Sequence, residues 1–265
     1  MKKAILFAAH GSKNRAASSA MGNILKMAKE AHPDIPVYSA FTSGHVLKKL
    51  REKGQKLPTV KQNLENLSVE GFTHVVVQSL HVIPGTEFTN ITRLLGRVEK
   101  GEIEFEKAVV GEPLLTNDQE IDEISDIILN LLEERDPQNE ALILVAHGSK
   151  YSDSGNSLYD KFKEVLEAKD ENAYLGKLNA EGGIEEISDR IKESGIKKAY
   201  LLPLLFGAGN HVKKDMAGEQ KDSWMNIVAS RGIETVPVAK GIGEFDVFAQ
   251  RWMDKLEKAI KQLEE

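Results

Sequence analysis

The chain has 265 residues, of which 41% are hydrophobic and 29% are charged, as is typical of a soluble globular protein. Its formal net charge of −6 gives no basis for a general affinity for nucleic acid, and no stretch approaches the roughly 20 apolar residues of a membrane helix. Because cysteine is absent, disulfides, thiolate ligands and thiol catalysis are excluded, and a metal site would need histidine, carboxylate or carbonyl ligands.

In the first half of the chain, short apolar runs alternate with charged stretches of helical period. These runs predict strands at residues 3–9, 37–41, 74–80 and 105–110. The first run follows two lysines, as in a secretory signal, but its apolar part at 4–9 is too short for one and has a near-copy in mid-chain. We therefore interpret it as a buried strand and expect a cytoplasmic protein.

The second half repeats this pattern. It predicts strands at residues 142–146, 174–178, 199–205 and 235–238. Continuous apolar strands separated by helices indicate parallel sheets covered on both faces. We expect an α/β fold of two similar flavodoxin-like lobes, each a roughly four-stranded parallel sheet flanked by helices, with a cleft between them. The charged segment 131–142 contains Pro137 and predicts the junction, so that the lobes span residues 1–136 and 137–265.

Two pairs of matching phrases indicate that the halves are copies. "AILFAAHGSK" places His10 where "ALILVAHGSK" places His147, an offset of 147 − 10 = 137 residues. "VVVQSLHVIPGTEF" aligns with "AYLLPLLFGAGNHV" at an offset of 211 − 87 = 124 residues, which sets Glu87 opposite His211. Each of these residues follows a strand. Since ligands of open α/β sheets bind outside the carboxyl ends of the strands, we expect all of them to face the cleft.

The side chains at these positions suit a metal site. Two neutral imidazoles, His147 and His211, together with one carboxylate, would bind a borderline divalent ion such as Co²⁺, Ni²⁺, Fe²⁺ or Zn²⁺. Glu87 and Glu181, the latter in "KLNAEGG", are the best placed carboxylates. A turn-capping role for a histidine and a solvated role for either glutamate remain the alternatives.

Other chemistries have less support in the sequence. The chain lacks the phosphate-binding loop G-x-x-x-x-G-K-[ST], the dinucleotide fingerprint G-x-G-x-x-G and the nucleophile elbow G-x-S-x-G. We therefore expect neither a bound nucleotide nor serine hydrolysis. The remaining histidines are interpreted as structural, although two of them, His45 and His81, lie near strand ends: His32, His45, His74 and His81.

Several longer phrases resemble a known family. They are "AFTSGHVLKKLR", "VVVQSLHVIPGTEF", "VAHGSK", "NAEGG", "LLPLLFGAGNHVKKDMAGEQKDSW" and "GIGE". In this order they are similar to the anaerobic cobalt chelatases of the class II chelatase family, and the resemblance covers nearly the whole chain. It implies insertion of Co²⁺ into sirohydrochlorin on the anaerobic route to cobalamin, without ATP.

The resemblance also implies roles for individual residues. His147, His211 and Glu181 match metal-binding positions of the family, and His147 and Glu87 match its catalytic positions. Which glutamate touches the metal and which handles protons stays open. The carboxylates of the substrate need hydrogen-bond donors or cations. The groups expected to contact them lie in the two repeated turns: His10, Ser12, Lys13, Ser149 and Lys150.

Two other functions fit the same residues. One is a ferrochelatase that serves sirohaem or haem synthesis, and the other is a carrier that binds a tetrapyrrole or a metal without turnover. In each case the expected partner is a small tetrapyrrole, with neither nucleic acid nor membrane, and a homo-oligomer is compatible with the sequence. The sequence does not decide metal preference, oligomeric state or the presence of a second, haem-binding site.

Overall fold

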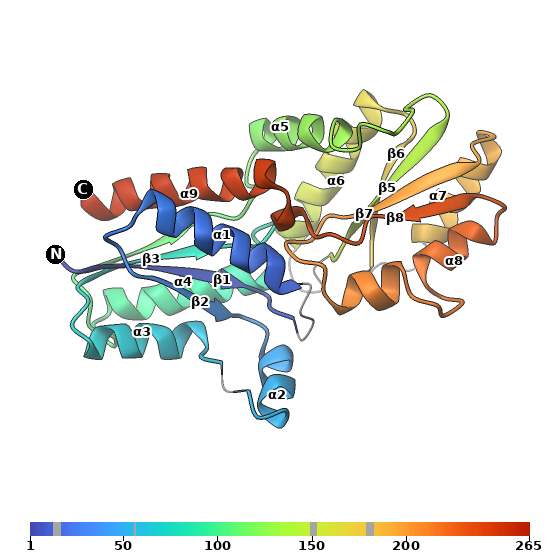
Figure 1. The fold of residues 1–265 in the computed structure, drawn as a ribbon. Helices are drawn as coiled ribbons and strands as arrows, with labels where there is room; N and C mark the ends of the chain where they lie inside the picture. The colour runs from blue at the N-terminus through green and yellow to red at the C-terminus, as the bar shows by residue number, and fades with distance from the viewer. Residues whose placement is uncertain (13–16, 56, 149–152, 179–182) are drawn as a thin grey trace.

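Two parallel sheets of four strands form the frame of the part of the molecule that the structure describes (Figure 1). The computed structural model describes residues 1–12, 17–55, 57–148, 153–178 and 183–265. In the first sheet the order is β2-β1-β3-β4, with β1 Lys3–Ala9, β2 Val37–Phe41, β3 His74–Ser79 and β4 Lys107–Gly111. In the second it is β6-β5-β7-β8, with β5 Glu140–Ala146, β6 Ala173–Lys177, β7 Lys198–Pro203 and β8 Glu234–Pro237.

The fold class predicted from the sequence is confirmed, and each strand ends within a few residues of its predicted limit. The central strands β1 and β5 are buried along almost their whole length because helices cover both faces of each sheet. The two sheets also have the same strand order, in agreement with the repeat seen in the sequence. The offset of 137 residues joins the first residues of these strands, Lys3 and Glu140.

Helices connect the strands of each sheet. In the first half they are α1 Ala17–Ala31, α2 Gly44–Glu52, α3 Val60–Val69, α4 Thr86–Glu99 and α5 Asp118–Leu129. In the second half they are α6 Asp153–Lys169, α7 Gly183–Glu193, the π-helix η1 His211–Met216, α8 Trp224–Ala229, the 3₁₀ turn η2 Ile242–Glu244 and α9 Asp246–Glu264. None of the helices in the described part of the chain combines the length and the apolar character that a bilayer crossing requires.

The two halves exchange their last helices. Helix α5 leaves the first sheet and packs on α6 of the second lobe, where Lys169 binds Asp126 at 2.6 Å. Helix α9 leaves the second sheet and covers β3 and β4 of the first (Figure 1). The junction near residue 136 stays a prediction. The chain crosses from the first lobe to the second between β4 and α5, and it crosses back between β8 and α9.

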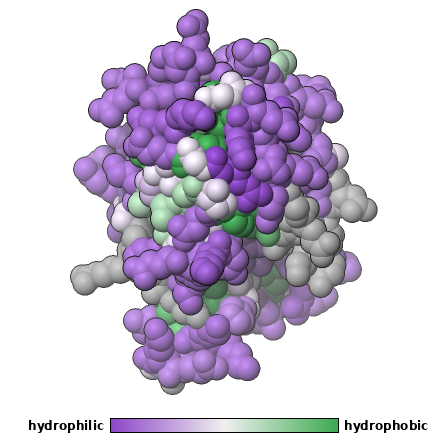
Figure 2. All heavy atoms as spheres, turned by 90° about the vertical axis from the view of Figure 1, so that its right-hand side faces the viewer, coloured by the Kyte–Doolittle hydropathy of each residue, from purple (hydrophilic) through white to green (hydrophobic). Residues whose placement is uncertain are grey.

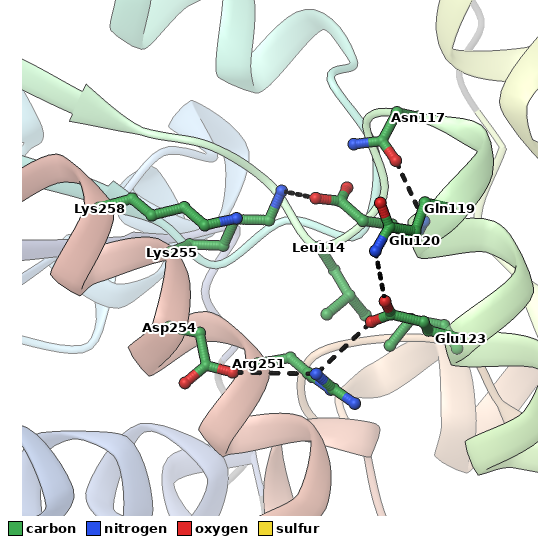
Figure 3. A pocket seen from close by; sticks show the side chains of 10 residues that line it. Leu114, Asn117, Gln119, Glu120, Glu123, Arg251, Asp254, Lys255 and Lys258 are labelled. Atoms are coloured by element: carbon green, nitrogen blue, oxygen red, sulfur yellow. Dashed lines mark hydrogen bonds and ion pairs between the residues drawn. The ribbon is translucent and has the colours of Figure 1, made fainter.

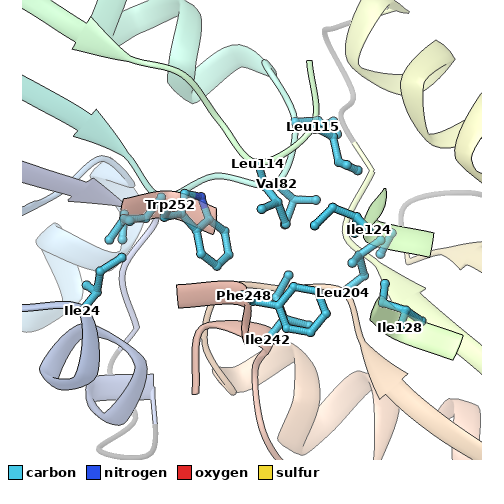
Figure 4. Close-up of a cluster of buried hydrophobic side chains, with 14 of the residues drawn as sticks. Ile24, Val82, Leu114, Leu115, Ile124, Ile128, Leu204, Ile242, Phe248 and Trp252 are labelled. Atoms are coloured by element: carbon cyan, nitrogen blue, oxygen red, sulfur yellow. The ribbon is translucent and has the colours of Figure 1, made fainter. Parts of the chain in front are cut away.

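One apolar cluster joins the two lobes at these crossings (Figure 4). It includes Ile5 from the first sheet, Leu144 from the second, and Phe248 and Trp252 from α9. The Trp252 ring packs edge-on against Phe206, with 5.3 Å between the ring centres, and its indole N–H donates to the carbonyl oxygen of His81 at 3.3 Å.

The outer end of the second lobe is covered mainly by hydrophilic side chains, with small apolar areas between them (Figure 2).

We expect Trp252→Ala to destabilise the protein by about 3–5 kcal/mol, because the fully buried indole would leave a cavity in the cluster that joins the lobes. Urea unfolding followed by circular dichroism measures the change. The control is Val69→Ala, at a side chain that is 90% exposed, for which the expected change is within about 0.5 kcal/mol. Equal unfolding midpoints for the two variants would contradict the central place of Trp252.

Candidate functional site

The repeated His-Gly phrase forms the turn that follows the central strand of each sheet. Gly11 has a φ of +89° and Gly148 a φ of +72°, the left-handed region that glycine adopts without strain. A Cβ on Gly11 would also lie 2.5 Å from Cγ of Phe41, so a side chain is excluded there by space as well. The turn therefore needs its glycine, and it leaves His10 and His147 at the carboxyl edges of β1 and β5.

Glu87 approaches His10 within the first lobe. Helix α4 begins after Gly85, which puts Glu87 in the first helical turn, where a carboxylate interacts favourably with the helix dipole. Its Oε1 lies 3.5 Å from Nδ1 of His10. Partial burial acts to raise the pKa of Glu87, but its interactions with His10, Thr42 and His81 outweigh burial and lower that pKa. The carboxylate form is therefore favoured beside an imidazole.

His81 lies behind this pair and is held in place by two hydroxyl groups. Its Nδ1 is 2.8 Å from Oγ of Ser79 and its Nε2 is 3.3 Å from Oγ1 of Thr42. Burial lowers the pKa of His81 to about 4; Glu87 opposes this shift and His10 adds to it. These contacts agree with the structural role that the sequence predicts for His81, and they add that its neutral ring is coupled electrostatically to Glu87.

The second lobe brings two imidazoles together. Nε2 of His147 lies 3.2 Å from Nε2 of His211, which is the first residue of the π-helix η1. Each ring has an acceptor at its other nitrogen: the carbonyl oxygen of Gly148 is 3.0 Å from Nδ1 of His147, and Oδ2 of Asp215 is 2.5 Å from Nδ1 of His211. Because a carbonyl and an ionised carboxylate only accept hydrogen bonds, both Nδ1 atoms are assigned the proton.

This assignment gives the pair the form in which it could bind one cation. In the neutral rings the two Nε2 atoms present lone pairs at a separation of 3.2 Å, and a proton or a metal ion between them would relieve their repulsion. Burial lowers the pKa of His147, and the neighbouring His211 and His10 lower it further, against the opposing effects of Gly148 and Asp215. A neutral imidazole is the form that binds metals.

The spacing of the two nitrogens agrees with metal binding. Two nitrogens that bind one tetrahedral ion at about 2.0–2.1 Å lie about 3.3 Å apart, close to the 3.2 Å found. Within the ranges that the structure describes, no three His, Asp or Glu side chains gather closely enough to hold an ion. Glu181, the third ligand suggested by the sequence, lies outside those ranges, so its contribution stays a prediction.

The first lobe faces the imidazole pair across a short distance. The ring centres of His10 and His147 are 6.0 Å apart. Oγ of Ser12 would stand only 3.1 Å from a Cβ on Gly209, so this glycine lets the turn of one lobe approach the loop before η1 of the other. The structure thus brings together four of the residues singled out in the sequence: His10, Glu87, His147 and His211. The other candidates in the repeated turns, Lys13, Ser149 and Lys150, lie outside the described residues.

Two groups at this site were missed in the sequence. Asp215 follows His211 by four residues, a spacing that places both on one side of a helix and could have identified the pair. Its place in a π-helix could not be foreseen; such helices are rare and are found frequently at functional sites. Thr42 follows β2 directly and, as a hydroxyl group among many, gave no signal.

A separate polar cavity of about 160 Å³ lies between α5 and α9 (Figure 3). Its charges neutralise one another. Lys255 binds Glu112 at 3.1 Å and also binds Glu120, while Arg251 lies 3.5 Å from Glu123. These ion pairs tie α9 to α5 and to the residue that follows β4, and so they stabilise the two crossing segments.

Comparisons with known proteins found a matching family and two similar relatives. A model of the cobalt chelatase (CbiK) family matches residues 3–261. A sirohydrochlorin cobaltochelatase, CbiKC, of Nitratidesulfovibrio vulgaris is 30% identical over 100% of this chain and 93% of its own length. A sirohydrochlorin cobaltochelatase of Salmonella typhimurium is 27% identical over 98% of this chain and 97% of its own length.

The fold is also similar to that of a solved chelatase. The sirohydrochlorin chelatase SirB from Bacillus subtilis subspecies spizizenii, solved in complex with cobalt, has a TM-score of 0.62. The comparison covers 100% of this chain and 97% of that one, at 15% identity. This likeness concerns the fold alone.

The pKa of His81 makes stability depend on pH. The unfolded chain binds a proton at this histidine near pH 6.5, whereas the folded chain does so only near pH 4, so stability falls as the pH falls through this window. We expect His81→Gln to show a smaller fall between these pH values in urea unfolding series. The control, His45→Gln, changes an exposed histidine and should keep the wild-type slope. Parallel curves for all three proteins would contradict the assignment.

We expect Asp215→Ala to weaken Co²⁺ binding about 10- to 100-fold, because His211 would lose the acceptor that fixes its ring and tautomer. Titration of the metal-free protein with Co²⁺, followed by visible absorption, measures the dissociation constant. Asp222→Ala removes an exposed carboxylate nearby in the sequence and should leave binding unchanged. If the two variants bind equally tightly, Asp215 does not position His211.

Proposed function

The chain belongs to the cobalt chelatase (CbiK) family, and on this basis we propose roles for its site residues in the insertion of Co²⁺ into sirohydrochlorin. The enzyme is a metal chelatase of cobalamin synthesis, and the metal ion is its substrate. The observation that carries the assignment of roles is the pair of Nε2 atoms 3.2 Å apart, with Glu87 and His10 on the opposite lobe.

His147 and His211 hold the incoming ion. Metallation requires that the ion loses part of its water shell, stays above the macrocycle and leaves when the ring nitrogens bind it. Few and exchangeable ligands suit this task better than a closed structural cage. Glu181 is the proposed third ligand. Asp215 acts as a positioning residue, because it fixes the proton on Nδ1 of His211 and leaves Nε2 free to bind.

Glu87 accepts protons from the macrocycle. Two pyrrole protons must leave as the metal enters, and an ionised carboxylate near the ring can take them one at a time, provided that the first is passed on before the second arrives. The lowered pKa keeps Glu87 ionised, the form that can accept a proton, although it also makes the carboxylate a weaker base; the contact with His10 gives the proton a route onward. His10, 46% exposed, would then pass a proton on to solvent or contact the substrate. The division assigns proton handling to the first lobe and metal binding to the second.

Several expectations from the sequence stay predictions. They are substrate contacts of Ser12, Lys13, Ser149 and Lys150, binding of Fe²⁺, Ni²⁺ or Zn²⁺ in place of Co²⁺, a reaction without nucleotide, and a cytoplasmic location. Association into a homo-oligomer and the lack of nucleic acid or membrane partners belong to the same group. Each can be tested on the purified protein or by fractionation of cells.

Anaerobic spectrophotometry tests the function. The purified protein is mixed with sirohydrochlorin and either Co²⁺ or Fe²⁺ at matched low concentrations, and formation of the metallated ring is followed over many turnovers. We expect faster insertion of Co²⁺. Faster insertion of Fe²⁺ would instead assign the enzyme to sirohaem synthesis, and binding of one equivalent without turnover would identify a carrier.

We expect His147→Ala to lower kcat/KM for metal insertion at least about 100-fold, because the pair would lose one of its two imidazoles. His10→Ala should lower it only modestly, since Glu87 still faces the site. The same anaerobic assay compares the two variants, and circular dichroism verifies that both are folded. Equal, large losses would show that both copies of the repeated histidine are needed, against the asymmetric roles proposed for His10 and His147.

A further inference from the structure

Helix α2 has no counterpart among the described residues of the second lobe. The first residues of β2 and β6, Val37 and Ala173, are 136 positions apart, whereas those of β3 and β7, His74 and Lys198, are 124 apart. The first lobe thus has 136 − 124 = 12 more residues between these strands. In the first lobe this connection contains α2 and α3; in the second, α7 is its one described helix.

The extra segment, residues 42–55, stands directly at the site. Its first residues are attached to the turn of His10: the N–H of Thr42 donates to the carbonyl oxygen of Ala9 at 2.8 Å, and that of Ser43 to the carbonyl oxygen of His10 at 3.2 Å. A parallel bridge between Phe41 and Thr59 later returns the chain to the end of β2. Figure 1 shows α2 at this carboxyl edge, apart from the helices that cover the first sheet.

Buried side chains fix the orientation of α2, and basic side chains occupy its exposed surface. The anchoring residues are Val46, Leu47 and Leu50. Lys48, Arg51 and Lys53 are exposed and Lys49 is partly exposed, against a single acidic residue, Glu52. None of these four cations has an acidic partner in the part of the chain that the structure describes. This concentration of unpaired positive charge occurs in a chain whose net charge is −6.

We propose that α2 binds the carboxylate side chains of the tetrapyrrole and thereby selects for highly carboxylated macrocycles. The inference rests on the proposed function, in which a macrocycle receives the metal from the imidazole pair and gives its protons to Glu87. From Ser43 the helix extends about 12 Å outward, at 1.5 Å per residue. Lysine and arginine side chains along this length can contact acidic groups at the rim of a macrocycle that lies beside His10. A surface with a single sign of charge also attracts a ligand of the opposite charge.

The position of the α2 cations favours a role in ligand binding over that of ordinary solvated surface charges. Loops at the carboxyl edge of a parallel sheet bind ligands, and an insertion in one of two repeated lobes at that edge changes the site without changing the frame. The other basic groups beside the described site, Lys213 and Lys214, belong to η1 of the second lobe. The α2 cations therefore add positive charge on the first lobe, which carries Glu87 and His10.

The test is the triple variant Lys48→Gln/Lys49→Gln/Arg51→Gln. Partly solvated ion pairs each contribute a factor of about two, so three of them predict a roughly eightfold higher KM and Kd for sirohydrochlorin. The value of kcat and the KM for Co²⁺ should stay near those of the wild type. Binding is measured by fluorescence of metal-free sirohydrochlorin, and the decrease of kcat/KM with added salt should be shallower in the variant.

A matched control removes three exposed lysines near the opposite edge of the first sheet: Lys26→Gln/Lys29→Gln/Lys261→Gln. It changes net charge by the same amount and should keep the wild-type KM and salt dependence. A tetrapyrrole with fewer carboxylates, used as a competitor, should show a smaller difference in affinity between the wild type and the α2 variant. If the α2 variant and the control behave alike while the wild type metallates sirohydrochlorin, the role of α2 is refuted. If the wild type does not metallate sirohydrochlorin, the proposed function itself fails.

Discussion

The apolar cluster that joins the two lobes is the constraint on which the site depends. Phe248 and Trp252 of α9 pack among residues of both sheets, so the carboxyl edges of the sheets stay at a fixed separation. In the proposed reaction, the metal ion moves from His147 to a ring nitrogen and a pyrrole proton moves to Glu87, and both transfers require the two edges to be held at the right distance. Trp252 connects this apolar cluster to the site directly, because its indole N–H donates a hydrogen bond to the carbonyl oxygen of His81.

Within this frame the two copies of one turn have acquired different chemistry. Both end in histidine followed by a left-handed glycine, but His10 meets a carboxylate and His147 meets a second imidazole. The difference arises at the paired positions of Glu87 and His211. In the proposed function, two nitrogens bind the metal and a neighbouring carboxylate accepts protons, so the two roles do not compete for the same lone pair.

Much of this arrangement could be predicted from the sequence. Strands that are buried on both faces have continuous apolar sequences, which can be recognised in the chain. The repeated segments alone predict that His10, Glu87, His147 and His211 lie at strand ends. The exchange of α5 and α9 could not be predicted, because an amphipathic pattern shows which face of a helix is buried but not which sheet covers it. The proton assignments depend on contacts such as His211 to Asp215, which require the π-helical geometry of η1.

The exchange of helices makes the two lobes dependent on each other for folding. A break between α5 and β5 would leave a first fragment whose sheet lacks α9 on β3 and β4, and a second fragment that lacks α5 against α6. Each fragment would expose to water the apolar face that its missing helix covers, a condition that favours association. The fragments could complete their cores only by complementing each other. The protein therefore has two lobes in its topology, but each lobe depends on a helix from the other half of the chain to complete its core.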